Sequence, residues 1–418
     1  MRIAIVGSGI SGLVCGWLLS RKHDVTLFES ESRIGGHTNT VDFEAFGKSW
    51  SADTGFMVFN DRTYPNFIRL LELLGVPSQP SDMSFSVVNE DSGLEYQGSS
   101  LNGLFAQRRN LVRPSFLKML REILRFNAFA SNGENASVAG ETLGEFVQRH
   151  RFSDGLVQNY LLPMTAAIWS APPSRVLDFP ADFLFRFYKN HGLLQLKDRP
   201  QWRTIPGGAR NYIEAITKGW QEQIRLNCPV REVRRRENLV ALSGDGFETE
   251  EFDAVVLACH APNSLAMLSE PSRLETEVLT TFAYQPNVAL LHTDVKQLPR
   301  KRRAWASWNY RVYSESEKPP TVTYDLSRLQ RLNTPQPVCV TLNPSFKIDE
   351  QHILARINYS HPLYSTAAIG AQQRRDELHA DRKILFAGAY WGNGFHEDGV
   401  NSALAVCEQF GLSLEPAV

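Results

Sequence analysis

Short apolar runs and stretches of helical periodicity follow one another along the chain. Together they predict a protein that contains both strands and helices. Residues 3–6 and 24–28 are short apolar runs, separated by closely spaced glycines and a stretch with helical periodicity. Two further continuous runs, at 252–259 and 383–389, are typical of strands that are buried on both faces. These runs predict an α/β architecture whose sheet is assembled from distant parts of the chain.

A second region, residues 101–190, is predicted to be mainly helical and is rich in aromatic side chains. Its helix at 114–130 places Lys118, Arg121 and Arg125 beside apolar positions. Such a basic amphipathic helix suits a membrane surface or the entrance to an apolar substrate site. It equally suits a helix that packs on the core with one solvated edge. Residues 131–140 are small and polar, and they predict a linker.

Strand-like runs dominate the later part of the chain and predict the floor of a cavity. These runs lie at residues 288–292, 304–310, 321–324 and 338–342. Between them, residues 299–303 form a basic cluster, PRKRR. Its default interpretation is a solvated turn, and its alternative is a contact with lipid headgroups.

Charge and cysteine content exclude several classes of protein. The chain has 44 Lys and Arg against 45 Asp and Glu, so no global field favours nucleic acid as a partner. The 5 cysteines are widely spaced without a CxxC pair, which argues against a metal centre or a disulfide framework and fits a reducing compartment. No apolar run reaches the roughly 18 residues of a membrane span. We therefore expect a cytoplasmic protein, with peripheral contact at the inner membrane surface as an option and the oligomeric state open.

The turn after the first apolar run carries the clearest candidate chemistry. Gly7, Gly9 and Gly12 have the spacing GxGxxG between a strand and a helix. The first glycine permits a tight turn, the second lets the backbone approach a pyrophosphate, and the third lets the helix pack on the strand. Glu29 ends the second strand, where an acid accepts hydrogen bonds from ribose hydroxyls and disfavours a ribose phosphate. The pattern predicts NAD or FAD at the helix N-terminus.

A second glycine pair, Gly35 and Gly36, favours FAD because it lets the chain fold back over the pyrophosphate and the flavin ribityl chain. With this pair, the sequence resembles the flavin-containing amine oxidoreductases, the superfamily of monoamine and polyamine oxidases, protoporphyrinogen oxidase and phytoene desaturases. His37 stands where the family signature has arginine. The resemblance implies a Rossmann-type, GR2-like FAD-binding domain with an inserted α+β substrate domain, as in monoamine oxidase. No cysteine precedes Cys407 beside the closing flavin motif, so we expect non-covalent FAD.

On this resemblance, three segments form the FAD-binding domain and two form the substrate domain. The FAD-binding segments are residues 1–85, 201–264 and 366–418, and the substrate segments are residues 86–200 and 265–365. The residues expected to hold FAD are Gly7, Gly9, Ser11, Gly12, Glu29, Ser30, Arg33, Gly35, Gly36, His37, Thr38, Gly55, Phe56, Val230, Gly388, Ala389, Asp398, Gly399 and Val400.

The closing motif GAYWGNGFHEDG supplies the expected catalytic residues. The resemblance places His396 and Glu397 at the flavin edge as candidate general bases, and it places Tyr390 and Trp391 beside the flavin face as aromatic walls. The last helix is expected to begin near Gly399, with its N-terminus toward the flavin. No metal ligand is expected.

The residues of the closing motif, together with the segments NYSHPLYS and SWNY, resemble the sequences of a bacterial subfamily of predicted flavoproteins. This subfamily is associated with cyclopropane-type and methyl-modified fatty acid synthesis. Where many amine oxidases have a lysine, the matching stretch 286–291 reads PNVALL, with Asn287 its nearest polar residue. His361 and Tyr364 are further candidate bases from the substrate domain. We therefore expect hydride transfer from an apolar substrate, such as a membrane phospholipid acyl chain, to flavin N5, with desaturation or isomerisation. The alternatives are an amine oxidase that releases hydrogen peroxide and a redox-partner flavoprotein.

Overall fold

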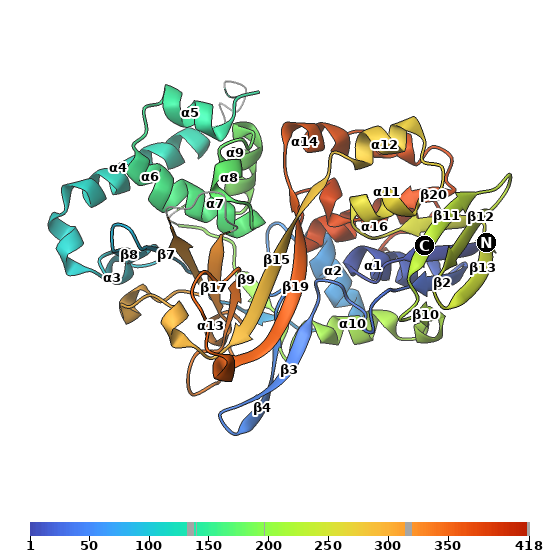
Figure 1. Ribbon diagram of the computed structural model, residues 1–418, viewed down its shortest axis with the longest axis horizontal. Coiled ribbons are helices and arrows are strands. Elements are labelled where there is room, and N and C mark those ends of the chain that lie inside the picture. The colour runs from blue at the N-terminus through green and yellow to red at the C-terminus, as the bar shows by residue number, and fades with distance from the viewer. Residues whose placement is uncertain (132–137, 139, 196, 314–319, 416–418) are drawn as a thin grey trace.

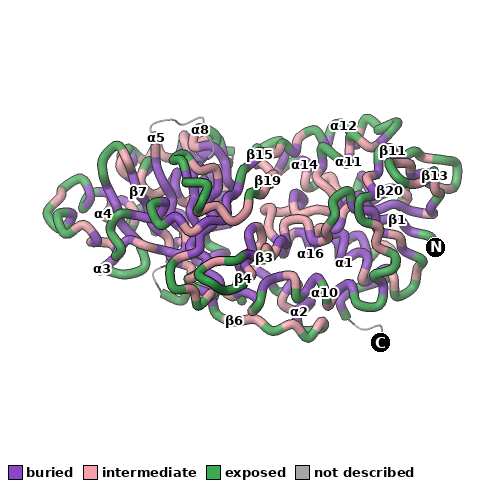
Figure 2. Tube along the Cα trace, turned by 60° about the horizontal axis from the view of Figure 1, so that its bottom comes forward, coloured by how far each residue is buried: buried purple, intermediate pink, exposed green. Residues whose placement is uncertain are grey.

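The computed structural model describes residues 1–131, 138, 140–195, 197–313 and 320–415. Most of the predicted linker at 131–140 lies outside these residues. Figure 1 shows two lobes, one built on a parallel sheet at the right and one built on a mainly antiparallel sheet at the left, in which only β16 and β7 pair in parallel among the described strands. Buried residues fill the interior of both lobes, as the colouring of Figure 2 shows.

The parallel sheet draws its strands from the beginning, middle and end of the chain. Its order is β10-β2-β1-β14-β20, and every neighbouring pair is parallel. The strands are β1 (Arg2–Val6), β2 (Asp24–Phe28), β10 (Ile224–Arg225), β14 (Ala254–Leu257) and β20 (Ile384–Phe386). Alternate residues of β1 enter different clusters, because successive side chains of a strand point to opposite faces. Ile3 and Ile5 join one core, while Ala4 and Val6 join the other.

Helices cover one face of the parallel sheet, and a smaller sheet with further helices covers the other. The first set is α1 (Ile10–Leu19), α2 (Pro65–Leu74), α10 (Arg210–Thr217) and α16 (His396–Glu408). The second set comprises β11 (Val230–Arg235), β12 (Val240–Gly244), β13 (Phe247–Phe252), α11 (Ala261–Met267), α12 (Arg273–Leu279) and α14 (Thr366–Gln372). The predicted α/β architecture is confirmed. The last helix begins at His396 rather than near Gly399, because Asp398 accepts a hydrogen bond from the backbone N–H of Phe395 and closes an earlier first turn.

The second lobe is built on a seven-stranded sheet in the order β19-β15-β18-β17-β16-β7-β8. Its strands are β7 (Phe85–Asn89), β8 (Leu94–Gln97), β15 (Ala283–His292), β16 (Trp308–Val312), β17 (Thr321–Asp325), β18 (Cys339–Leu342) and β19 (Ile353–Leu363). The run predicted at 304–310 is strand only from Trp308, because residues Arg302–Ala304 form a 3-10 turn. β15 and β19 are long and paired, and they run between the two lobes in Figure 1.

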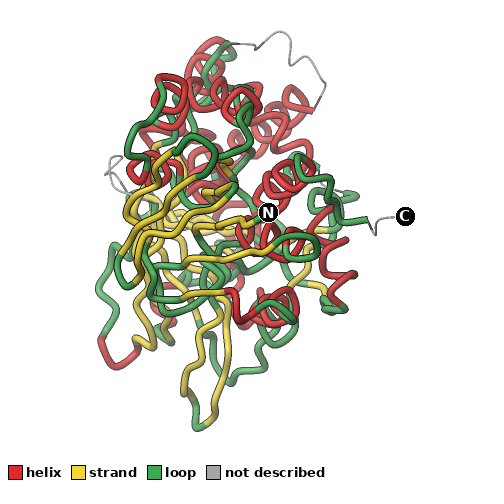
Figure 3. Tube along the Cα trace, turned by 90° about the vertical axis from the view of Figure 1, so that its right-hand side faces the viewer, coloured by secondary structure: helices red, strands yellow, loops and turns green. Residues whose placement is uncertain are grey.

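The region predicted to be helical does form helices, and these gather on one side of the seven-stranded sheet (Figure 3). They are α3 (Leu101–Leu104), α4 (Pro114–Ser131), α5 (Leu143–Arg149), α6 (Asp154–Leu156), α7 (Leu162–Trp169), α8 (Pro173–Val176) and α9 (Ala181–Asn190). Aromatic side chains of these helices and of the sheet form one common core. Of the described helices, none has both the length and the apolar character needed to cross a bilayer.

Shorter elements join the lobes. A hairpin of β3 (Thr40–Ala45) and β4 (Lys48–Asp53) projects from the molecule, and β5 (Phe59–Asn60), β6 (Gln79–Pro80) and β9 (Trp202–Thr204) form a small sheet. The remaining short helices are α13 (Leu326–Leu329) and α15 (Arg375–Leu378). The buried Asp53 carboxylate accepts hydrogen bonds from the Ala209 N–H and the Thr40 hydroxyl, so it ties the hairpin to the start of α10.

Candidate active site

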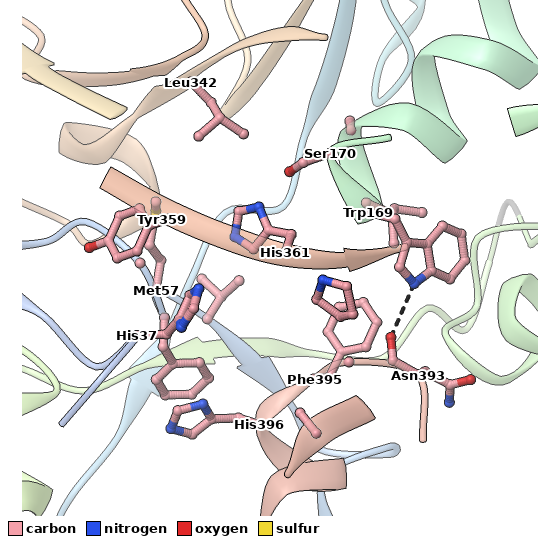
Figure 4. A pocket seen from close by; sticks show the side chains of 18 of the residues that line it. His37, Met57, Trp169, Ser170, Leu342, Tyr359, His361, Asn393, Phe395 and His396 are labelled. Atoms are coloured by element: carbon pink, nitrogen blue, oxygen red, sulfur yellow. Dashed lines mark hydrogen bonds between the residues drawn. The ribbon is translucent and has the colours of Figure 1, made fainter. Parts of the chain in front are cut away.

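A cavity of about 1690 Å³ lies between the two lobes. Its lining begins at the glycine-rich turn after β1 and continues past the paired strands β15 and β19 to α4 and α7. Figure 4 shows side chains from both lobes that face this space. Pockets for small ligands are roughly 300–1,000 Å³, so this cavity has room for a dinucleotide and a second molecule together.

The glycine-rich turn has the geometry of a pyrophosphate cradle. Gly7 has φ +102°, and a Cβ there would lie 2.7 Å from the Ala258 carbonyl oxygen. A Cβ at Gly12 would lie 1.9 Å from the Gly7 carbonyl oxygen, so α1 packs against the turn only with glycine at this position. A Cβ at Gly9 would meet nothing within 4 Å. The second glycine therefore borders open space, where the backbone can approach an anion.

Hydrogen bonds from backbone N–H groups and from one side-chain hydroxyl hold Glu29 beside this turn. Its carboxylate accepts hydrogen bonds from the Ser8 N–H at 2.8 Å, the Ser8 hydroxyl at 2.5 Å and the Glu31 N–H at 3.0 Å. The side chain is only 8% exposed, and these donors offset the cost of burying its charge. Glu29 thus lines the cavity as an oriented acceptor for hydroxyl groups.

Two buried nitrogens next to the cradle have no hydrogen-bond partner among the described residues. They are Nη1 of Arg33 and Nε2 of His37. Gly35 and Gly36 have φ of +114° and +56°, and this left-handed backbone brings Gly36 against Gly9. Unpaired buried nitrogens are costly, so they indicate a ligand that supplies oxygen acceptors. The cradle, the oriented carboxylate and these nitrogens fit the diphosphate and hydroxyl groups of FAD.

Histidines surround the point where the two lobes meet. The ring of His37 lies 5.4 Å from His361 and 6.1 Å from His260, centroid to centroid, and stacks on Tyr359 at 5.0 Å. Burial lowers the pKa of His361 and of His260 to about 4 and that of His396 to about 3, because it disfavours the charged ring. Burial lowers the pKa of His37 as well. These histidine rings are therefore neutral at physiological pH.

A chain of hydrogen bonds determines which nitrogen of His361 carries the proton. The backbone N–H of Val288 donates to Oδ1 of Asn343, and Nδ2 of Asn343 donates to Oδ1 of Asn287. Nδ2 of Asn287 then donates to the Gln285 carbonyl and, at 3.0 Å, approaches Nδ1 of His361. Since a backbone donor fixes one end and a carbonyl acceptor fixes the other, Nδ1 of His361 must accept. Neutral His361 therefore carries its proton on Nε2.

The half of the cavity in the second lobe is largely apolar, with Asn127 and Arg199 among its few polar side chains. α4 and α7 contribute aliphatic side chains, and the sheet contributes aromatic rings: Leu120, Ile123, Met164, Ile168, Trp308 and Tyr324. Glu29, in the cradle, is the single carboxylate among the described residues that line the whole cavity. Within the same described part, no group of His, Cys, Asp and Glu has the arrangement of a metal site.

The sequence profile of flavin containing amine oxidoreductases matches residues 10–302. The chain belongs to this family. Members of the flavin-containing amine oxidoreductase family are FAD-dependent oxidoreductases.

Two curated relatives and two solved structures illustrate the range of the family. A candidate flavin-containing monoamine oxidase of Mycobacterium tuberculosis, AofH, is 25% identical over 280 residues, which are 64% of this chain and 59% of that protein. A tryptophan 2-monooxygenase of Allorhizobium ampelinum is 38% identical over 181 residues, 42% of this chain and 24% of that protein. This chain thus spans at most about three fifths of the length of these relatives.

Among solved structures, cyclohexylamine oxidase from Brevibacterium oxydans has a TM-score of 0.70 at 16% identity, and the match covers 98% of this chain and 99% of that one. A CLA-producing fatty acid isomerase from P. acnes has a TM-score of 0.65 at 15% identity, with 98% of each chain covered. These similarities establish a shared fold. The same fold therefore serves an amine oxidase and a fatty acid isomerase.

The residues expected to hold the family's cofactor divide into two groups. Those that line the cavity are Gly7, Gly9, Ser11, Glu29, Ser30, Gly35, Gly36, His37, Gly55, Phe56, Val230, Gly388 and Ala389. Those outside the lining are Gly12, Arg33, Thr38, Asp398, Gly399 and Val400. Several of the second group support the first. A Cβ at Gly399 would lie 2.6 Å from Ile10, and Ser11 donates to the Gly399 carbonyl, so the α1 and α16 N-termini are held together.

The four expected catalytic residues occupy different surroundings. His396 lines the cavity, where its ring stacks on Phe56 at 3.6 Å and its Nε2 lies 2.8 Å from the Tyr212 hydroxyl. Tyr390 also lines the cavity, whereas Trp391 packs against Phe282 and Tyr390 in the core. Glu397 is outside the lining. Its carboxylate accepts hydrogen bonds from the backbone N–H groups of two residues of α2, Asn66 at 3.0 Å and Phe67 at 2.8 Å.

Sequence reasoning missed several aromatic residues of the lining, among them Tyr284, Tyr359, Trp308 and Tyr324. Tyr359 and His361 are two residues apart on β19, so the period-two alternation of this strand was the available signal. The partners that they face come from other strands and from the first lobe. No local pattern identifies such partners.

Replacing Glu397 with alanine is expected to destabilise the protein without removing its flavin chemistry. The substitution leaves the first turn of α2 without its acceptor, at about 1–3 kcal/mol for each buried N–H. We expect a loss of roughly 2–4 kcal/mol in the free energy of unfolding, measured by denaturant titration. Glu408→Ala is the matched control, because Glu408 is exposed at the C-terminal end of α16, the helix that also carries Glu397. A stable Glu397→Ala protein that no longer reduces its flavin would contradict the capping role.

Proposed function

We propose that this chain is an FAD-dependent oxidoreductase that removes hydride from an apolar acyl chain and thereby desaturates or isomerises it. The observation that carries the proposal is the continuity of the cavity. One end is the cradle with Glu29, and the other is an apolar space bounded by α4, α7 and the seven-stranded sheet. The sequence resemblance to flavoproteins associated with fatty acid modification supports the same class of substrate.

FAD supplies the acceptor for the hydride, at flavin N5, when it is bound. The cradle residues Gly7, Gly9 and Glu29 bind its diphosphate and ribose, and the unpaired nitrogens of Arg33 and His37 supply further donors. Non-covalent attachment is supported by the two cysteines that line the cavity. Burial raises the pKa of Cys228 and raises that of Cys259 to about 11, so both stay protonated and poorly nucleophilic.

The apolar half of the cavity favours an acyl chain over an amine. Burying aliphatic carbon against Leu120, Ile123 and Met164 contributes about 0.8 kcal/mol for each CH₂ group. A protonated amine would instead lose its hydration, and the described lining offers it no carboxylate beyond Glu29. The walls thus select the substrate by desolvation.

A neutral histidine of the cavity accepts the proton that the substrate loses together with the hydride. Loss of a hydride develops positive charge on the substrate carbon, and neutral rings tolerate that charge better than imidazolium ions would. His260 lines the cavity and has no hydrogen bond at its ring nitrogens within the described structure, so it is our candidate for the proton acceptor. His361 presents N–H rather than a lone pair at Nε2, and it acts as a hydrogen-bond donor.

An amine oxidase that uses oxygen and releases hydrogen peroxide is the second candidate. Membership of the family and the names of its relatives, AofH and cyclohexylamine oxidase, favour it. Neutral histidines also suit an uncharged amine. The two functions differ in the substrate that reduces the flavin.

The deciding experiment follows flavin absorbance anaerobically. The holoenzyme is mixed with unsaturated or methyl-branched phospholipid in detergent micelles, then separately with common primary amines. Bleaching by lipid alone supports the proposal, and bleaching by amines with peroxide release in air replaces it with the second candidate. Bleaching by NADH or NADPH without substrate indicates a redox-partner flavoprotein instead. For an isomerase, which returns the hydride, the product chain is analysed by mass spectrometry.

Flavin reduction should be independent of pH from about 5.5 to 8 and should fall as the pH drops below about 5. The pKa of His260 is lowered to about 4, so its ring accepts a proton only above that value. The unfolded ring titrates near 6.5, so burial of neutral histidine also costs stability as the pH falls from 6.5 toward 4. Stopped-flow rates are therefore paired with a melting curve at each pH. A rate that rises toward acid pH in folded protein contradicts neutral histidines.

A further inference from the structure

We propose that one surface of the second lobe docks on a membrane containing anionic phospholipid, so that the cavity opens directly onto the bilayer. The docking surface comprises residues 101–125, from α3 through most of α4, and residues 300–303. The inference rests on the proposed function, because it specifies where an acyl chain enters. It combines two basic segments that lie far apart in the sequence.

Large apolar side chains stand exposed on the docking surface. Val112 is 81% exposed and Leu101 is 76% exposed, and Leu111, Leu117 and Leu124 are exposed as well. They lie on α3, on the 3-10 turn Arg108–Val112 and on α4. Exposed apolar clusters of this kind mark interaction sites, because the free energy falls when apolar surface is removed from water.

Basic side chains lie on the same segments as these apolar groups. Residues 101–125 contain six, which are Arg108, Arg109, Arg113, Lys118, Arg121 and Arg125. Glu122 is the only acidic residue in this stretch, and its buried carboxylate accepts a hydrogen bond from the Ser153 hydroxyl. The tertiary structure adds the exposed Lys301, Arg302 and Arg303, because the turn that carries them contacts α3. A surface that carries both exposed apolar groups and cations complements a membrane interface of acyl chains and anionic headgroups.

The cavity reaches the molecular surface within this patch. Leu101 and Leu124 are exposed, and both also line the cavity together with Leu104, Leu120 and Ile123. α3 and α4 lie at the outer edge of the second lobe, away from the parallel sheet (Figure 1). An acyl chain that enters between α3 and α4 would pass from the bilayer into the apolar half of the cavity without crossing water.

The charge also argues against a second copy of this chain as the occupant. Two copies that met through the docking surface would bring their basic residues together, and like charges repel. On an anionic bilayer, by contrast, each basic residue near the headgroups strengthens binding. The membrane partition coefficient rises roughly fivefold for every such residue.

The experiment is co-sedimentation of the holoenzyme with vesicles. We expect binding to phosphatidylcholine vesicles containing phosphatidylglycerol, little binding to phosphatidylcholine alone, and a loss of at least about tenfold in affinity when the salt is raised to screen charge. Arg108→Glu with Arg109→Glu, and separately Leu111→Ser with Val112→Ser, should each weaken binding about tenfold or more. None of these four residues lines the cavity. Arg273→Glu and Leu226→Ser, exposed residues of the other lobe, are the matched controls.

Equal binding to neutral vesicles, no binding to either kind, or equal losses in the controls would overturn the docking surface. So would a dimer in sedimentation velocity that Val112→Ser dissociates. An acyl substrate dispersed in detergent separates the two proposals, because it should reduce the flavin of the docking variants as fast as that of the wild type. If no lipid reduces the flavin, the proposed function fails, whatever the vesicles show.

Discussion

Replacing Gly9 with alanine is expected to weaken FAD binding by about 5- to 150-fold, the effect of roughly 1–3 kcal/mol of overpacking, while the apoprotein stays folded. The backbone at Gly9 has φ −65° and ψ 177°, which alanine adopts without strain. A Cβ there meets no protein atom within 4 Å, so the new methyl group would project into the space assigned to the diphosphate. FAD affinity is measured by titrating apoprotein with FAD and following flavin fluorescence.

Two other glycines provide the comparison for this result. Gly370→Ala, in α14, also places its methyl group in open space and should leave FAD binding unchanged. Gly12→Ala should lower both FAD binding and the melting temperature, because its Cβ would lie 1.9 Å from the Gly7 carbonyl oxygen. If Gly9→Ala bound FAD like the wild type, the diphosphate would not occupy this cradle.

Replacing Asn287 with aspartate is expected to slow flavin reduction by the proposed substrate by about 10²–10⁴-fold near neutral pH, the range that proton positioning typically contributes. The carboxylate can only accept a hydrogen bond, so Nδ1 of His361 would have to carry the proton and donate, which reverses the tautomer described above. A negative neighbour would also raise the pKa of His361 from its value of about 4. The resulting imidazolium opposes the positive charge that develops on the substrate as hydride leaves.

The pH profile separates this effect from a loss of structure. In the aspartate variant, the rate should fall as the pH drops through the new, higher pKa of His361, within a range where the wild-type rate is flat. Aspartate cannot donate to the Gln285 carbonyl, so some stability will be lost, and FAD absorbance with a melting curve reports it. His352→Gln, on the turn that leads into β19 and outside the cavity lining, is the control. A slow variant with an unshifted profile would contradict the assigned tautomer.

The cradle was predictable because all of its determinants are local. A strand, a turn that needs left-handed glycine, a helix and a second strand follow one another between Arg2 and Phe28, and Glu29 comes next. Backbone geometry at Gly7 and the close packing at Gly12 depend on immediate neighbours and on one parallel strand. Residue spacing therefore carries the information.

The roles of the residues around the cavity were not predictable in the same way. Glu397 stands beside His396 in the sequence, yet its carboxylate caps α2 while the histidine lines the cavity. The two side chains leave one helix in different directions, and only packing decides what each meets. Similarly, the state of His361 depends on Asn287 and Asn343, which belong to neighbouring segments of the sheet.

The sequence by itself determined the alternation of strands and helices, the glycine-rich turn and the acid beside it, because propensity and spacing act over a few residues. Only the tertiary structure decided the neutral state of the buried histidines, the largely apolar half of the cavity and the contact of residues 101–125 with residues 300–303. Those features depend on burial and on contacts between distant segments. Burial lowers the histidine pKa values, and long-range packing decides which polar groups find partners.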